Sequence, residues 1–218
     1  IAKTQKPILI IDEIQTLEGL YINGEKELIK EFLNFCVRLT KELHLAHVLI
    51  LSSNTIFIDR IYNDAKLKVT SDFYKIDHLS YEDTKEWLVG EGFKEDEITL
   101  IWDYLGGCIP YLYEVISHRK KIEDLKKYLD EKAFMAYAEI MHYLTDFEKN
   151  EDREIFRTIA KEIVQKGYFD TTNIDTHTKK IMSMWAQKEI LFYDPLSVKV
   201  RGNNRLYEKG MEILLSKA

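Results

Sequence analysis

The pattern of apolar and polar residues near the N-terminus predicts alternating strands and helices. Residues 6–11 and 47–51 are short aliphatic runs, which are typical of strands buried on both faces of a parallel sheet. Between them, apolar residues recur at helical spacing over residues 24–43. A strand, a helix and a strand in this order predict a right-handed parallel crossover, and residues 73–76 are predicted as a further short strand.

The middle of the chain has the pattern of a helical domain. Four helices are predicted there, near residues 81–90, 95–105, 110–118 and 122–147. Ser80 is suited to cap the first of them, and Pro110 is suited to the first turn of the third. Glycines mark the breaks between the first three helices. The strands of the N-terminal part are therefore expected to stop before residue 80.

The C-terminal part mixes helices with strands. The predicted elements are helices over residues 151–166 and 176–188, strands over 190–193 and 197–201, a turn at 202–204 and a last helix over 206–215. Helices followed by a basic β-ribbon are typical of a winged helix-turn-helix domain.

Charge is distributed unevenly along the chain. Residues 1–147 carry 18 Lys and Arg against 26 Asp and Glu, whereas residues 148–218 carry 13 against 11. Broad nucleic-acid binding is therefore not expected of the acidic part, whereas the C-terminal part is a candidate for binding through a local patch. No apolar run approaches the roughly 18 residues of a membrane span, and the first residues are too polar for a signal peptide. With two cysteines far apart, we expect reduced thiols in a cytoplasmic protein that has no membrane partner.

Polar side chains follow both aliphatic runs. Asp12 and Glu13 come directly after the first, and Ser52, Ser53 and Asn54 come after the second. Parallel sheets present their chemistry at the carboxyl ends of the strands, where one carboxylate can hold a hard cation and its neighbour can act as a base. The simpler interpretation is a strand that stops where polar residues begin, followed later by an ordinary turn.

Three segments in this order, over roughly residues 6–115, resemble the archaeal ATPase family of the AAA+/STAND group. They are the Walker B-like segment ending at Asp12-Glu13, the sensor-like segment 52–54, and the segment Gly106-Gly107-Cys108-Ile109-Pro110. The last resembles the family's Gly-Gly-x-Pro segment with one extra residue before the proline. A helix end followed by an N-terminal proline is its simpler interpretation.

The resemblance implies an ATP-driven ATPase or switch that uses Mg²⁺. Asp12 would bind Mg²⁺ and Glu13 would be the general base, while Ser53 or Asn54 would sense the γ-phosphate. The remaining two candidate nucleotide-binding residues are Gly107 and Pro110.

The fold implied is α/β, with part of a parallel P-loop NTPase-type sheet, a helical lid and a C-terminal winged helix. The expected domains are residues 1–78, 79–147 and 148–218. Whether the protein assembles as a homo-oligomer is left open by the sequence.

Two features of the family are missing. The phosphate loop G-x-x-x-x-G-K-[ST] is absent, because residues 19–26 have the lysine displaced and follow Walker B instead of preceding it. We therefore expect the natural protein to continue upstream of Ile1, or another segment to fill the gap between the second and last strands. Residues 67–71 also lack the arginine that family members usually carry there, so the source of an arginine finger stays open.

The C-terminal domain has two candidate kinds of partner. Lys179 and Lys180 on the recognition helix, with Arg201 and Arg205 near the wing, are the candidate contacts to duplex DNA. A protein-interaction module is the other interpretation. The alternative for the whole chain is a non-catalytic winged-helix regulator or adaptor with a degenerate ATPase half.

Overall fold

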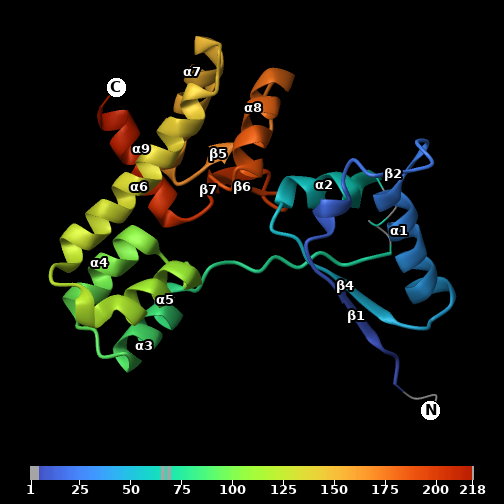
Figure 1. The fold of residues 1–218 in the computed structure, drawn as a ribbon, viewed down its shortest axis with the longest axis horizontal. Coiled ribbons are helices and arrows are strands. Elements are labelled where there is room, and N and C mark those ends of the chain that lie inside the picture. Colours follow the sequence, from blue (N-terminus) through green and yellow to red (C-terminus); the bar gives the residue numbers. More distant parts are fainter. Residues whose placement is uncertain (1–4, 65–66, 68–69, 218) are drawn as a thin grey trace. The chain divides into compact units, whose positions relative to one another are not determined.

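The computed structural model describes residues 5–64, 67 and 70–217. The chain divides into two compact units, Ile1–Tyr74 and Lys75–Ala218, which we call the N-terminal and C-terminal units (Figure 1). The predicted division into three domains has its first boundary close to this one. The stretches predicted as lid and winged helix lie together in the C-terminal unit, and their separation at residue 147 stays a prediction.

The N-terminal unit contains the predicted parallel strand pair. Strand β1 (Ile8–Ile11) pairs with β4 (His47–Ile50), with Ile8 opposite His47 and Ile11 opposite Ile50. The other elements are η1 (Ile14–Leu17), β2 (Tyr21–Ile22), β3 (Lys26–Glu27), α1 (Leu28–Val37), its continuation η2 (Arg38–Glu42) and α2 (Thr55–Asp64). The prediction of strand, helix and parallel strand is therefore confirmed, while the sequence pattern missed α2 and the β2–β3 hairpin.

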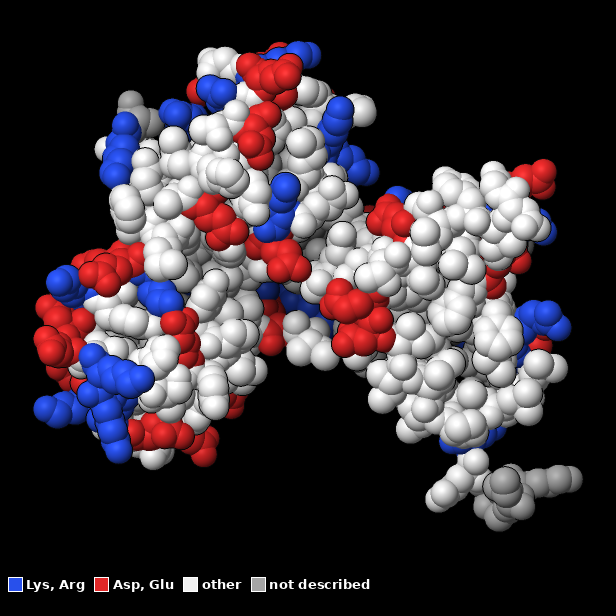
Figure 2. All heavy atoms as spheres, viewed as in Figure 1, with Lys and Arg blue, Asp and Glu red and all other residues white. Residues whose placement is uncertain are grey.

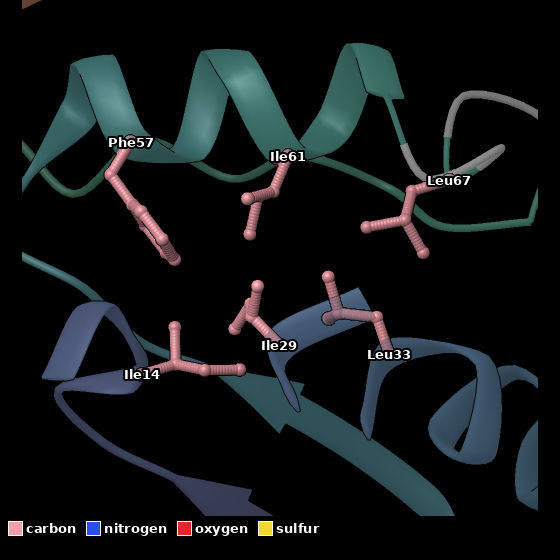
Figure 3. Close-up of a cluster of buried hydrophobic side chains, with 6 residues drawn as sticks. All are labelled: Ile14, Ile29, Leu33, Phe57, Ile61 and Leu67. Atoms are coloured by element: carbon pink, nitrogen blue, oxygen red, sulfur yellow. The ribbon is translucent and has the colours of Figure 1, made fainter. Parts of the chain in front are cut away.

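A small apolar core joins three helical elements of this unit. Ile14 from η1 points toward side chains of α1 and α2, as Figure 3 shows. The buried residues of this cluster are Ile14, Ile29, Leu33, Phe57, Ile61 and Leu67. Phe57 and Ile61 are four residues apart, which puts them on one face of α2. This core fixes the position of η1, the element that directly follows Asp12 and Glu13.

The expectation that both strands are buried on both faces is wrong for this structure. Ile8 is 63% and Ile10 is 61% exposed, and Leu49 is 50% exposed. Among the described residues the sheet has two strands, so each strand has one edge without a neighbour. Only the carboxyl ends of the strands reach the core, where Ile11 and Ile50 pack against the buried cluster. The part of the N-terminal unit visible in Figure 2 is accordingly mostly uncharged.

The further strand predicted at residues 73–76 does not form. These residues have no regular secondary structure, and Tyr74 and Ile76 are 83% and 88% exposed. An extended segment becomes a strand only when a neighbour completes its hydrogen-bond ladder, and no described strand lies beside this one. Part of the segment that lacks the family's arginine, residues 68 and 69, lies outside the described residues.

The C-terminal unit is mainly helical, and each predicted helix is present with ends within a few residues. Its helices are α3 (Tyr81–Gly90), α4 (Glu95–Leu105), α5 (Ile109–His118), η4 (Arg119–Lys121), α6 (Leu125–Thr145), α7 (Asn150–Lys166), α8 (Thr176–Gln187) and α9 (Arg205–Ser216). Helix α9 packs along α6, and a Cβ at Gly210 would lie 2.9 Å from the Tyr137 amide nitrogen. The close approach of these two helices therefore requires a glycine at this position.

Three strands complete the C-terminal unit. They are β5 (Phe169–Asp170), β6 (Leu191–Asp194) and β7 (Lys199–Gly202), arranged antiparallel in the order β5-β7-β6. The pattern did not predict β5, which has only two residues. The turn of the hairpin is formed by residues 195–198, whereas Gly202-Asn203-Asn204 leads into α9 and Asn204 caps that helix. Arg201 and Arg205 thus lie at the open end of the hairpin, not beside its turn as the sequence analysis assumed.

Within the described part of the chain, no helix combines the length and the apolar character needed to cross a membrane.

Candidate functional site

The register of the strand pair brings the two polar segments of the N-terminal unit to one edge. The Leu51 amide donates a hydrogen bond of 2.8 Å to the Ile11 carbonyl oxygen, which continues the ladder just past β1 and β4. Asp12 and Glu13 therefore leave the sheet beside Ser52 and the residues that follow it. The edge in question is the carboxyl end of two parallel strands, where α/β proteins bind their ligands.

The two carboxylates follow β1 in a strained turn. The Glu13 amide donates a hydrogen bond of 2.9 Å to Oδ1 of Asp12. Glu13 has φ 53° and ψ 40°, the left-handed region, which costs a residue other than glycine roughly 1–2 kcal/mol. Both side chains are exposed to solvent.

Ser52 and Asn54 shape the turn after β4. The Asn54 amide donates to the Ser52 hydroxyl oxygen at 3.1 Å. The Oδ1 atom of Asn54 accepts a hydrogen bond of 3.0 Å from the Phe57 amide, and the Asn54 side chain thereby caps the first turn of α2. Ser53 is exposed at the same edge. These contacts account for the turn. They leave the side-chain nitrogen of Asn54, Nδ2, as the group of that side chain that can donate to a ligand.

Gln15 connects the two polar segments, a role that the pattern of residues alone did not indicate. Its Nε2 atom donates to Oε2 of Glu13, and its Oε1 atom accepts a hydrogen bond of 2.5 Å from the Ser52 hydroxyl. The signal in the sequence was its position: a polar residue two places after Glu13, directly after the apolar Ile14 and inside η1. Only the pairing of β1 with β4 reveals which residue it reaches.

The oxygen atoms at this edge suit a Mg²⁺ ion held jointly with a phosphate ligand. No group of three His, Cys, Asp or Glu side chains able to hold a metal occurs among the described residues. Mg²⁺ needs no such cage, because it is commonly held by one or two carboxylates together with water and substrate phosphates. Asp12 supplies one exposed carboxylate and Ser53 is also exposed at this edge, whereas the Ser52 hydroxyl is already hydrogen-bonded to Gln15.

In the segment that contains the candidates Gly107 and Pro110, both glycines have structural roles. Gly106 ends α4 with φ 54° and ψ −145°, a conformation that disfavours residues with a Cβ. A Cβ at Gly107 would lie 2.0 Å from the Leu79 carbonyl oxygen, and the Leu79 amide donates to the Gly107 carbonyl oxygen at 3.0 Å. Pro110 is the second residue of α5, where its missing N–H costs nothing.

The four candidate nucleic-acid residues divide into two pairs. Lys179 and Lys180 are exposed on α8, and neither forms an ion pair with another described residue. Arg201 is bound to Asp77 and lies over the ring of Phe192. The second arginine, Arg205, forms ion pairs with acidic residues of α4 and α9.

Asp77 is the centre of a charged cluster at the start of the C-terminal unit. Lys75 Nζ lies 2.9 Å from both Asp77 and Asp194, and Arg201 contacts the other oxygen of Asp77. Burial by itself raises the pKa of Asp77, but the hydrogen bonds from Lys75 and Arg201 outweigh it and lower that pKa well below its ordinary value. The cluster fixes the segment before α3 to strands β6 and β7.

The α/β fold with its small parallel sheet and many helices resembles that of Walker-type ATPases. A solved Walker-type ATPase of Pyrococcus abyssi has the same fold, with a TM-score of 0.61 at 15% identity, over 95% of this chain and 63% of that one. The model of the ATPase domain found predominantly in Archaea matches residues 1–115. The chain belongs to this archaeal ATPase family.

Curated relatives extend over nearly the whole chain. An uncharacterized ATP-binding protein of Methanocaldococcus jannaschii is 34% identical over 224 residues, covering 98% of this chain and 60% of its own length. Another from Pyrococcus abyssi is 32% identical over 203 residues, covering 93% of this chain and 57% of its own length. The chain therefore spans a little over half the length of these relatives.

Proposed function

We propose that this chain carries the water-activating edge of an ATPase of the STAND/AAA+ type, a nucleotide-driven switch. The observation that carries the proposal is the pairing of β1 with β4, which brings Asp12 and Glu13 beside residues 52–54. Membership of the archaeal ATPase family and the ATP-binding relatives support it.

The proposed chemistry is hydrolysis of the γ-phosphate. Glu13 accepts a proton from a water molecule while the oxygen of that water forms a bond to the γ-phosphorus. The bond from the γ-phosphorus to the β,γ-bridging oxygen breaks. The products are ADP and inorganic phosphate. Asp12 would hold Mg²⁺, which would neutralise charge on the phosphates. The Ser53 hydroxyl or the side-chain Nδ2 of Asn54 would donate a hydrogen bond to a γ-phosphate oxygen. Gly107 and Pro110 would border the nucleotide.

The phosphate loop, whose backbone amides and lysine bind the β- and γ-phosphates in this family, is not proposed to come from these 218 residues. Residues 19–26, which contain two glycines and a lysine, form the hairpin of β2 and β3, with Asn23 and Gly24 both at positive φ in its turn. This is the geometry of a tight hairpin turn, not of a loop that leads from a strand into a helix. The proposal therefore assigns the phosphate loop to sequence outside the chain described.

The decisive experiment measures ATP hydrolysis and ATP binding separately on the full-length protein. Glu13→Gln should retain ATP binding but slow hydrolysis by roughly 10²–10⁴, the scale of removing a general base. Asp12→Asn should instead weaken binding that depends on Mg²⁺, because the ion loses a charged ligand. A full-length protein that binds no ATP, or a Glu13→Gln variant that hydrolyses it at the unchanged rate, would refute the assignment.

The C-terminal unit is proposed to carry a winged-helix interaction module. The order α7, β5, α8, β6, β7 and the antiparallel hairpin support this proposal. The exposed lysines of α8 favour duplex DNA as the partner, with Lys179 and Lys180 reaching phosphates. The ion pairs of Arg201 and Arg205 favour a structural role for those two residues, and a protein partner is the alternative outcome of the binding test.

A further inference from the structure

Gln15 links the two strand ends that carry the proposed chemistry. Its amide group contacts the Glu13 carboxylate at one end and the Ser52 hydroxyl at the other, across 37 residues of sequence. We infer that Gln15 is a positioning residue, which makes the orientation of the Glu13 carboxylate depend on the loop of residues 52–54. The inference rests on the proposed function, because it names what directs the proposed base.

Chemistry allows only one direction for this hydrogen-bond chain. A carboxylate only accepts hydrogen bonds, so the Gln15 nitrogen must face Glu13 and the Gln15 oxygen must face a donor. The Ser52 hydroxyl is that donor, and its oxygen accepts in turn from the Asn54 amide at 3.1 Å. The chain therefore runs from the Asn54 backbone through Ser52 and Gln15, and ends on a carboxylate oxygen of Glu13.

The backbone around Gln15 is fixed on both sides. Ile14, the residue before it, is 1% exposed and lies in the core with Ile29 and Phe57 (Figure 3). Thr16, the residue after it, donates from its hydroxyl to the Glu13 carbonyl oxygen at 2.9 Å. Because the amide is presented from a fixed position, it can hold Glu13 in one orientation with little loss of further side-chain freedom.

The loop at the other end of the chain carries the proposed γ-phosphate contacts. Ser53 and Asn54 follow Ser52 directly, and the Asn54 side chain also caps α2. A displacement of this loop changes the hydrogen bond from Ser52 to Gln15, and so changes the bond that orients Glu13. The arrangement thus connects contact with the γ-phosphate to the direction of the base, through one side chain.

The test is steady-state ATP hydrolysis by the full-length protein with Gln15→Leu. We expect kcat to fall about 10-fold to 100-fold, the scale for misplacing a catalytic group, while the KM for ATP changes less than about twofold. In a Glu13→Gln background the same change should cause no further loss, since Gln15 acts through that carboxylate. Ser52→Ala, which cuts the chain at its other end, should give a smaller fall in kcat.

Glu18→Ala is the matched control. Glu18 directly follows η1 and pairs with Arg60 at 2.6 Å, but it takes no part in the hydrogen-bond chain, so its kcat should stay near the unmodified value. If Gln15→Leu does not fold, judged by circular dichroism, Ser52→Ala alone decides the matter.

The outcomes separate the inference from the proposed function. Unchanged hydrolysis by Gln15→Leu, with Glu13→Gln inactive, overturns the inference and leaves the function standing. A loss that adds to that of Glu13→Gln also overturns it, because Gln15 would then act by another route. A full-length protein that hydrolyses no ATP overturns the proposed function and the inference together.

Discussion

Replacing Gly107 with alanine tests whether this glycine is required by packing alone. A Cβ at this position would lie 2.0 Å from the Leu79 carbonyl oxygen and 2.6 Å from the Leu79 nitrogen. Both neighbours are backbone atoms, so no side chain can rotate away. The segment before α3 would have to shift, and the hydrogen bond from the Leu79 amide to the Gly107 carbonyl oxygen, 3.0 Å long, would be lost or weakened.

The size of the effect follows from these two contacts. Overpacking costs about 1–3 kcal/mol, and the lost hydrogen bond adds about 0.5–1.5 kcal/mol. We therefore expect Gly107→Ala to lower the free energy of unfolding by about 2–4 kcal/mol. With a urea dependence of roughly 2 kcal/mol per molar, the unfolding midpoint of the C-terminal unit should fall by about 1–2 M.

Tryptophan fluorescence during urea unfolding of the 218-residue chain is a suitable assay. All three tryptophans, Trp87, Trp102 and Trp185, belong to the C-terminal unit, so the signal reports on that unit alone. The control is Gly90→Ala: Gly90 ends α3 and a Cβ there would meet no atom within 4 Å. This control should leave stability unchanged or raise it by up to about 1 kcal/mol, since alanine favours a helix.

A Gly107→Ala midpoint equal to that of the unmodified chain would refute the steric argument. It would leave nucleotide contact as the remaining role assigned to Gly107. A loss of stability in both variants would point instead to a general intolerance of change in these helices.

Two further predictions concern charges of the C-terminal unit. Asp77→Asn should lower the free energy of unfolding by about 1 kcal/mol at neutral pH, the scale of a solvent-screened ion pair. Because the folded-state pKa of Asp77 is lowered, this stability is present above the unfolded-state pKa of about 4 and is lost as the pH falls below it. The free energies of unfolding of the unmodified protein and of Asp77→Asn should therefore become equal in acid. Lys179→Ala with Lys180→Ala should flatten the salt dependence of duplex DNA binding by about two units, whereas Arg201→Ala with Arg205→Ala should change it less, because those arginines are already paired. Absence of DNA binding at low salt, or a larger effect of the arginine pair, would contradict the assignment.

Much of the fold could be predicted because it depends on local patterns. The helices of the C-terminal unit follow from apolar spacing and from caps such as Ser80, which accepts a hydrogen bond from the Asp83 amide as expected. The parallel pairing of β1 with β4 follows from two aliphatic runs separated by a helix. The β2–β3 hairpin and strand β5 were missed, because strands of two residues have too few positions to show an alternating pattern.

The strand predicted at residues 73–76 shows the limit of this reasoning. Its composition is that of a strand, but a strand exists only through a neighbour, and the described residues supply none. Arg201 shows a similar limit. Its positive charge suggested a contact to phosphate, whereas the folded chain places Asp77, 124 residues away in sequence, directly against it.

The sequence by itself determined the chemistry available at the end of β1, since Asp12 and Glu13 directly follow an aliphatic run. It also determined which residues form the long helices, because helical periodicity and caps act over a few neighbouring positions. Only the tertiary structure decided that Gln15 joins Glu13 to Ser52, and that Gly107 lies against the Leu79 backbone. These contacts depend on strand register and on close packing between distant segments, which no local pattern of residues specifies.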